Sequence, residues 1–97
     1  MVLSATVTKK SVKYTQDKLH TVTFGFILKD NISGTEVEVI NEDVSCEYRD
    51  GEAPSQKVAE IKGKVNLKIS RYKAEQVIFN SAALDTAAAS INAGVIL

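Results

Sequence analysis

The spacing of the apolar residues changes once along this chain, near residues 50–54. Before that point apolar and polar residues alternate, which is the pattern of a half-buried β-strand. After it, apolar residues recur at steps of three and four, which is the pattern of an amphipathic helix: Val58, Ile61, Val65, Ile69 and Tyr72. One change of period in 97 residues predicts a single α+β domain, with a sheet in residues 1–50 and a helical part in residues 54–93.

The alternating half divides into about four runs. The segments TQDK, DNISG and NED separate them, and each contains Asp, Asn or Gly, which tolerate turn geometry. Short links between successive strands predict an antiparallel meander of about four strands, with one apolar and one polar face. The apolar positions change from odd to even numbers near Lys9 and Lys10, and this shift predicts a β-bulge there.

The helical half carries its own start and stop signals. Pro54 is suited to a first helical turn, and Gly94 is a natural stop. Between them the apolar stripe slips after Tyr72, and Asn80 or Ser81 could cap a new helix. We therefore expect one long helix that is broken near Asn80, or two helices, followed by an extended apolar tail at residues 94–97.

The charges form blocks although the chain has no net charge. Residues 1–29 hold five lysines against Asp17, residues 30–52 hold eight acids against Arg49, and residues 53–97 hold six bases against three acids. The acids Glu36, Glu38 and Glu47 are expected to share an acidic sheet face. Such blocks indicate either pairing within the chain or complementary faces on neighbouring molecules, and the sequence leaves both open.

Few residues could support catalysis. The chain has one histidine and one cysteine, His20 and Cys46, and both are predicted on the apolar face of the sheet. A Cys–His nucleophile pair is conceivable there, but a small buried cysteine is the more common situation. The five glycines are isolated and form no phosphate-binding loop. We expect no enzyme activity, no cofactor, no metal and no small-molecule substrate.

A basic stripe follows one face of the predicted helix. Lys64, Lys68 and Arg71 could meet phosphates, yet Glu60 and Glu75 interrupt the same stripe and no aromatic residues accompany it. A solvated helix face is therefore expected, and nucleic acid is not an expected partner. No run of about 20 apolar residues is present, so no membrane-spanning helix is predicted.

The end of the chain is nearly uncharged. Asp85 is its single charged residue from Ala82 onward, and small residues surround it. Such a helix predicts contact with another protein surface, although folding back onto its own sheet is the alternative. The predicted assembly surface consists of Leu84, Ala88, Ile91, Val95, Ile96 and Leu97. We expect a non-enzymatic structural protein that forms homo-oligomers or joins other structural proteins. The alternative is a small regulatory or binding module that docks on another protein or on nucleic acid.

The layout also resembles a known class of proteins. The start MVLSATVTKKSVKYT, the strand meander and the segment SRYKAEQVIFNSAALDTAAASIN are similar to small structural proteins from the virion, neck and tail modules of tailed bacteriophages. The likeness covers the general layout of the chain and carries no functional residue with it. It implies a virion subunit that is used in many copies; without a phage origin, we expect a cytoplasmic protein.

Overall fold

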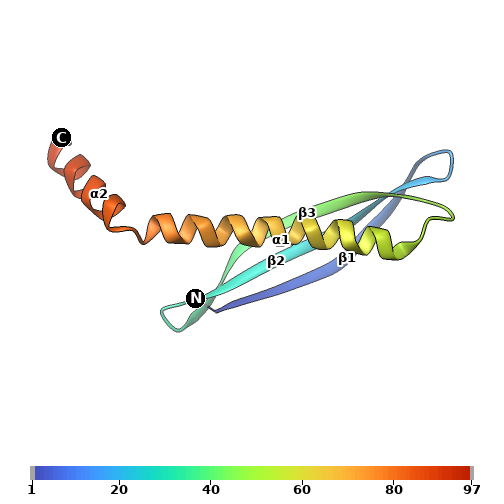
Figure 1. Cartoon of the computed structure of the whole chain (residues 1–97), viewed down its shortest axis with the longest axis horizontal. Helices are drawn as coiled ribbons and strands as arrows, with labels where there is room; N and C mark the ends of the chain where they lie inside the picture. Colours follow the sequence, from blue (N-terminus) through green and yellow to red (C-terminus); the bar gives the residue numbers. More distant parts are fainter. Residues whose placement is uncertain (1, 97) are drawn as a thin grey trace. The chain divides into compact units, whose positions relative to one another are not determined.

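The computed structural model describes residues 2–96 and confirms an α+β chain. Three strands, β1 (Leu3–Gln16), β2 (Leu19–Ile32) and β3 (Thr35–Arg49), are followed by two helices, α1 (Pro54–Phe79) and α2 (Ala82–Gly94) (Figure 1). The chain divides into two compact units within α1: unit 1 is Met1–Asn66 and unit 2 is Leu67–Leu97. Each unit is described separately below.

Unit 1 contains an antiparallel sheet in the order β1-β2-β3. Two-residue turns join the strands, and their residues have the positive φ angles of tight hairpins: Asp17 and Lys18 in the first turn, Ser33 and Gly34 in the second. In the second turn the Asn31 side chain accepts a hydrogen bond from the Gly34 backbone N–H at 3.1 Å. The TQDK and DNISG segments therefore form turns, as predicted.

The strand pairing has three irregularities, one of them between Tyr14 and Gln16 beside the first turn, and the other two keep the apolar side chains on one face. In β1, Lys9 lies opposite Phe24 and Ser11 opposite Thr23, so Lys10 is an extra residue. This is the bulge that the sequence predicted. A second extra residue, Val39, lies between the pairs that β3 makes with Leu28 and Lys29 of β2.

The prediction of four strands is wrong, and Val39 is the reason. The turn-forming residues of NED suggested a turn there, but residues 41–43 pair with residues 25–27 of β2. An extra residue in one strand and a turn between two strands produce the same shift in alternation. The third and fourth predicted strands are therefore one bulged strand, β3.

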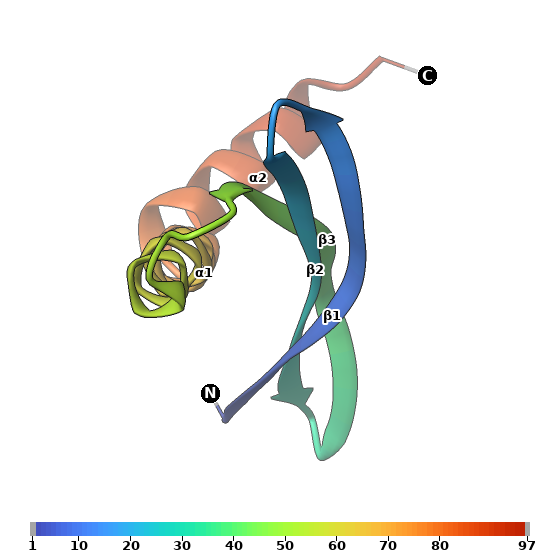
Figure 2. The same ribbon diagram turned by 90° about the vertical axis from the view of Figure 1, so that its right-hand side faces the viewer.

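The core of unit 1 lies between the sheet and residues 54–66 of α1, which cover one face (Figure 2). Strands β2 and β3 supply most of this core, and α1 adds two residues. The buried apolar residues are Phe26, Leu28, Val44, Cys46, Ile61 and Val65. Asp30 is also buried on this face, although the sequence suggested a turn position for it. No residue of β1 belongs to this set among the residues that the structure describes.

Of the two arrangements that the sequence left open, the structure shows two separate helices and not a single long broken helix. α1 starts at Pro54, as predicted, and ends at Phe79. The Gln76 carbonyl accepts both the Asn80 backbone N–H at 3.0 Å and the Asn80 side-chain amide at 2.9 Å, so Asn80 closes the last turn of the helix. Ser81 then caps α2, because its Oγ accepts from the Leu84 N–H at 3.3 Å. The chain thus breaks where the sequence placed a new cap.

Candidate functional site

The predicted assembly residues of α2 lie on one stripe of the helix. Leu84, Ala88 and Ile91 follow one another at steps of four and three; we call these three residues the α2 stripe. Leu84, Ala88 and Ile91 line a hollow of about 430 Å³ in unit 2 together with Phe79. Phe79, which is 69% exposed, was not predicted as part of this surface.

The tail beyond α2 is also exposed. The backbone of Val95 is extended, and its N–H bonds to the Asn92 carbonyl at 3.4 Å, so the helix ends at Gly94. Val95 is about half exposed and Ile96 is 96% exposed. Leu97, the last predicted assembly residue, lies outside the described residues.

α2 has no buried residue over its whole length, Ala82–Gly94. It has 13 residues, and an isolated helix of roughly 12–15 residues is only marginally stable in water. The Ser81 cap and Asp85 in the first turn help, since an acid near a helix N-terminus interacts favourably with the helix dipole. The apolar stripe of α2 nevertheless remains partly exposed, with Leu84 43% and Ile91 68% exposed.

A second apolar surface lies in unit 1. A groove of about 450 Å³ separates the sheet from the first half of α1. Its apolar lining comes from all three strands and from the helix: Val7, Val22, Phe24, Cys46, Tyr48, Pro54, Val58, Ile61 and Val65. We call this the sheet–helix groove. Nothing in the sequence indicated that the face would be left open.

The acidic residues lie on the opposite, polar face of the sheet. Register places Glu36, Glu38 and Glu47 opposite Asn31, Lys29 and Thr21 of β2, on the face that α1 does not cover. Glu36 accepts a long hydrogen bond from Ser4 of β1 at 3.5 Å. The three acids therefore share one face of the sheet, with Glu36 and Glu38 near the start of β3 and Glu47 near its end, and Glu38 has Lys29 directly opposite.

Gly25 allows a further charge pair to cross this polar face. Lys10 Nζ lies 2.9 Å from Asp43 Oδ1 although β2 runs between their strands. The Lys10 side chain passes over Gly25, where a Cβ would come within 3.0 Å of Lys10 Cδ. Part of the charge asymmetry between the blocks is thus neutralised within the chain.

The predicted basic helix face is partly used within the protein. Lys64 belongs to unit 1, where its Nζ donates to the Ser45 carbonyl of β3 and lies 3.7 Å from Glu60. Lys68 and Arg71 belong to unit 2; Lys68 is half-buried and Arg71 is exposed. Lys64 is therefore only partly available to phosphates.

His20 and Cys46 share the helix-covered face but have different surroundings. His20 Nε2 lies 3.0 Å from Asp50 Oδ1, and its ring meets Tyr14 edge-on at 5.5 Å. Cys46 is buried opposite Val22. Burial raises the pKa of the Cys46 thiol, and the nearby Glu60 carboxylate raises that pKa further. A nucleophilic cysteine needs a lowered pKa, so this environment favours packing over reactivity.

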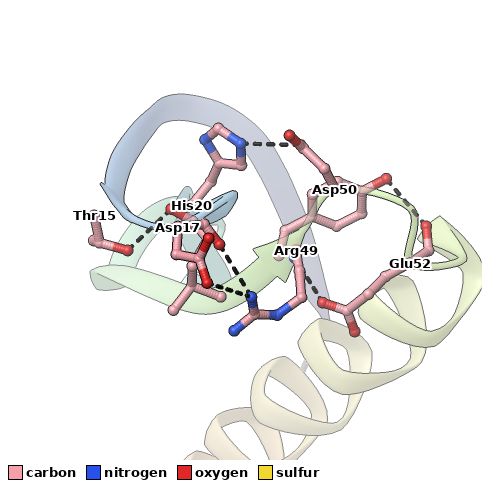
Figure 3. Close-up of polar contacts among 8 residues, drawn as sticks. Thr15, Asp17, His20, Arg49, Asp50 and Glu52 are labelled. Atoms are coloured by element: carbon pink, nitrogen blue, oxygen red, sulfur yellow. Dashed lines mark hydrogen bonds and ion pairs between the residues drawn. The ribbon is translucent and has the colours of Figure 1, made fainter.

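A polar network holds the connection between β3 and α1 (Figure 3). Arg49 donates to the Asp17 carbonyl of the first hairpin at 3.0 Å, and the Tyr48 hydroxyl donates to the Glu52 carbonyl at 3.1 Å. The Glu52 carboxylate accepts from the Arg49 backbone N–H at 2.6 Å, and this bond is the main cause of its lowered pKa. These contacts fix the start of α1 and hence one wall of the sheet–helix groove.

Within residues 2–96, no three His, Cys, Asp or Glu side chains are grouped closely enough to hold a metal ion. None of the described helices combines the length and the apolar character needed to cross a membrane. Comparison with protein families, with curated proteins and with solved structures found no match to this chain.

Proposed function

We propose that this protein is a non-enzymatic structural subunit that assembles with copies of itself through α2 and the C-terminal tail. One observation carries the proposal: α2 buries none of its residues within unit 2, while its apolar stripe and Ile96 face solvent. Exposed apolar surface of this kind marks contact sites in soluble proteins. The resemblance of the layout to phage structural proteins adds support for a subunit used in many copies, as in a virion.

The energetics favour an assembly that depends on concentration. Leu84, Ile91, Val95 and Ile96 are all largely exposed. Complete burial of an aliphatic side chain gives about 1.5–3 kcal/mol, so the four give at most about 12 kcal/mol. Association costs on the order of 4–15 kcal/mol in lost freedom. One such contact is therefore weak, and we expect the assembly to form at high protein concentration and to dissociate on dilution.

The test compares the mass in solution of the wild type with that of two matched variants. Ile91→Asp places a charge in the α2 stripe, whereas Ser90→Asp places the same charge on the adjacent residue outside it. We expect light scattering to show the wild type and Ser90→Asp as oligomers that dissociate on dilution, and Ile91→Asp as a monomer. A wild type that stays monomeric at high concentration would refute self-assembly.

The alternative function, docking on nucleic acid or on an unrelated protein through the basic helix face, has weaker support. Lys64 already donates to Ser45 and lies near Glu60. These contacts within the chain offset part of the charge of Lys64, which weakens the attraction to phosphates on which such a face depends.

A further inference from the structure

The sheet of unit 1 is covered on only part of its apolar face. Register places Val7, Val12 and Tyr14 of β1 on the same face as Phe26 and Leu28 of β2. The two β2 residues are fully buried, whereas Val12 and Tyr14 are 58% and 62% exposed. An α-helix is about 10 Å wide and strands are about 4.8 Å apart, so one helix covers about two strands. The third strand, β1, is left bare.

The sheet–helix groove follows this bare strip. Val7 and Val22 form its sheet side, and Val58 and Ile61 form its helix side. An adjacent hollow of about 390 Å³ is lined by Val12 and shares Val22, Tyr48 and Pro54 with the groove, so the apolar surface extends along β1.

We infer that the sheet–helix groove receives α2 of a second copy of this chain. The inference rests on the proposed self-assembly and names the surface that accepts α2. Helices pack side by side at about 8–10 Å, so a second helix beside α1 would lie over β1 and complete the layer. α2 has 13 residues and is therefore about 20 Å long. Its alanines allow close approach to the groove walls, and its stripe supplies Leu84 and Ile91 to fill them.

Charge also matches between α2 and the groove. The helix side of the groove carries Lys57 and Lys62, and Lys9 of β1 lies on the same face of the sheet. Glu52 lies 3.4 Å from Lys57 and balances part of this charge. The single charge of α2 is Asp85. An acidic residue on the incoming helix therefore meets a basic rim, which favours this occupant over a basic segment.

The length of the helices favours a second copy over the same chain. Residues 67–79 of α1 span about 20 Å, and α2 is equally long. Even if the chain reversed its direction completely at Asn80 and Ser81, the end of α2 would reach back only as far as about Asn66. Pro54, Val58 and Ile61, which line the far part of the groove, would remain uncovered by the chain's own α2.

The test uses one variant that cannot donate α2 and one that cannot accept it. Ile91→Asp disables the stripe, and Val58→Glu places a charge in the groove at a residue that is about half exposed. Val7→Lys disables the groove from the strand side and guards against an effect peculiar to α1. Ala59→Glu, at the neighbouring residue outside the groove lining, is the matched control. Circular dichroism confirms the fold of each variant.

We expect all three disabled variants, Ile91→Asp, Val58→Glu and Val7→Lys, to be monomers by size-exclusion chromatography with light scattering, and Ala59→Glu to match the wild type. A 1:1 mixture of Ile91→Asp with Val58→Glu should form a complex of one copy of each, because one intact stripe still meets one intact groove. The mixture with Val7→Lys should behave identically.

The remaining outcomes separate the two proposals. If Val58→Glu and Val7→Lys keep the wild-type mass while Ile91→Asp is a monomer, α2 binds elsewhere: the groove inference is wrong and the assembly through α2 stands. If the disabled variants stay monomeric when mixed, the groove inference is also overturned. A wild type that is itself a monomer overturns both.

Discussion

Glu52 joins the end of β3 to the start of α1 through both oxygens of its carboxylate. Oε1 accepts from the Arg49 N–H at 2.6 Å, and Oε2 lies 3.4 Å from Lys57 Nζ. The backbone bond from Arg49 is the largest cause that lowers the Glu52 pKa below its ordinary value of 4.5, and Lys57 lowers that pKa further. The charged form is therefore favoured in the folded state.

The lowered pKa of Glu52 predicts a pH-dependent share of the stability of unit 1. A carboxylate with a lower pKa in the folded state stabilises the fold above its unfolded pKa, and this contribution is lost as the pH falls through the folded pKa. We expect Glu52→Gln to lower the urea midpoint at pH 7 and to have little effect at pH 3. The control Glu47→Gln removes a carboxylate from the end of β3, away from the Arg49 N–H and Lys57 contacts. An equal loss at both pH values for Glu52→Gln would contradict the prediction.

At the scale of single elements, the stability of α2 depends strongly on its N-cap residue. Ser81 is the N-cap, and the helix that follows has no buried residue. Loss of a serine cap costs about 1 kcal/mol, which is roughly a fivefold change in the folded population of a marginal helix. We expect Ser81→Ala to reduce the far-ultraviolet ellipticity of the dilute protein, while Ser90→Ala leaves it unchanged or raises it. Identical spectra for Ser81→Ala and the wild type would show that the cap is unimportant.

The elements also show which features could be read from the sequence. The bulge at Lys10 and the break before Ser81 were predictable, because each leaves a local mark in spacing or capping. The bulge at Val39 leaves the same mark as a turn, and the polar residues of NED favoured the turn. The number of strands therefore depends on how residues 41–43 pair with β2, and no local sequence pattern shows that pairing.

The candidate site was predictable to a similar degree. The α2 stripe follows from spacing and from missing charge alone. The sheet–helix groove could not be predicted from the sequence, because Val7 and Val12 of β1 alternate with polar residues just as Val22 and Phe24 of β2 do. Only the position of α1 over two of three strands decides which of these side chains remains exposed.

For the whole molecule, the junction between the helices is the expected weak point of the dilute chain. Phe79 is exposed at the end of α1, next to the exposed residues Val77 and Ile78. Proteases cut where the chain opens at low cost, and helix ends without packed side chains do so. We expect chymotrypsin to cut first after Phe79 and to release residues 80–97, with protection at concentrations where the protein assembles. Mass spectrometry of a time course identifies the first fragment, and an earlier cut at Tyr14 would point instead to β1.

The extra residue in β1 also bears on fibril formation. A long, flat edge strand offers unpaired backbone groups that recruit further strands without limit, as in amyloid. In β1 the bulge at Lys10 twists that edge, and Lys9, Lys10 and Lys13 place positive charges along it. This edge is therefore a poor template for cross-β growth, so the self-assembly that we propose would not compete with fibril growth along β1.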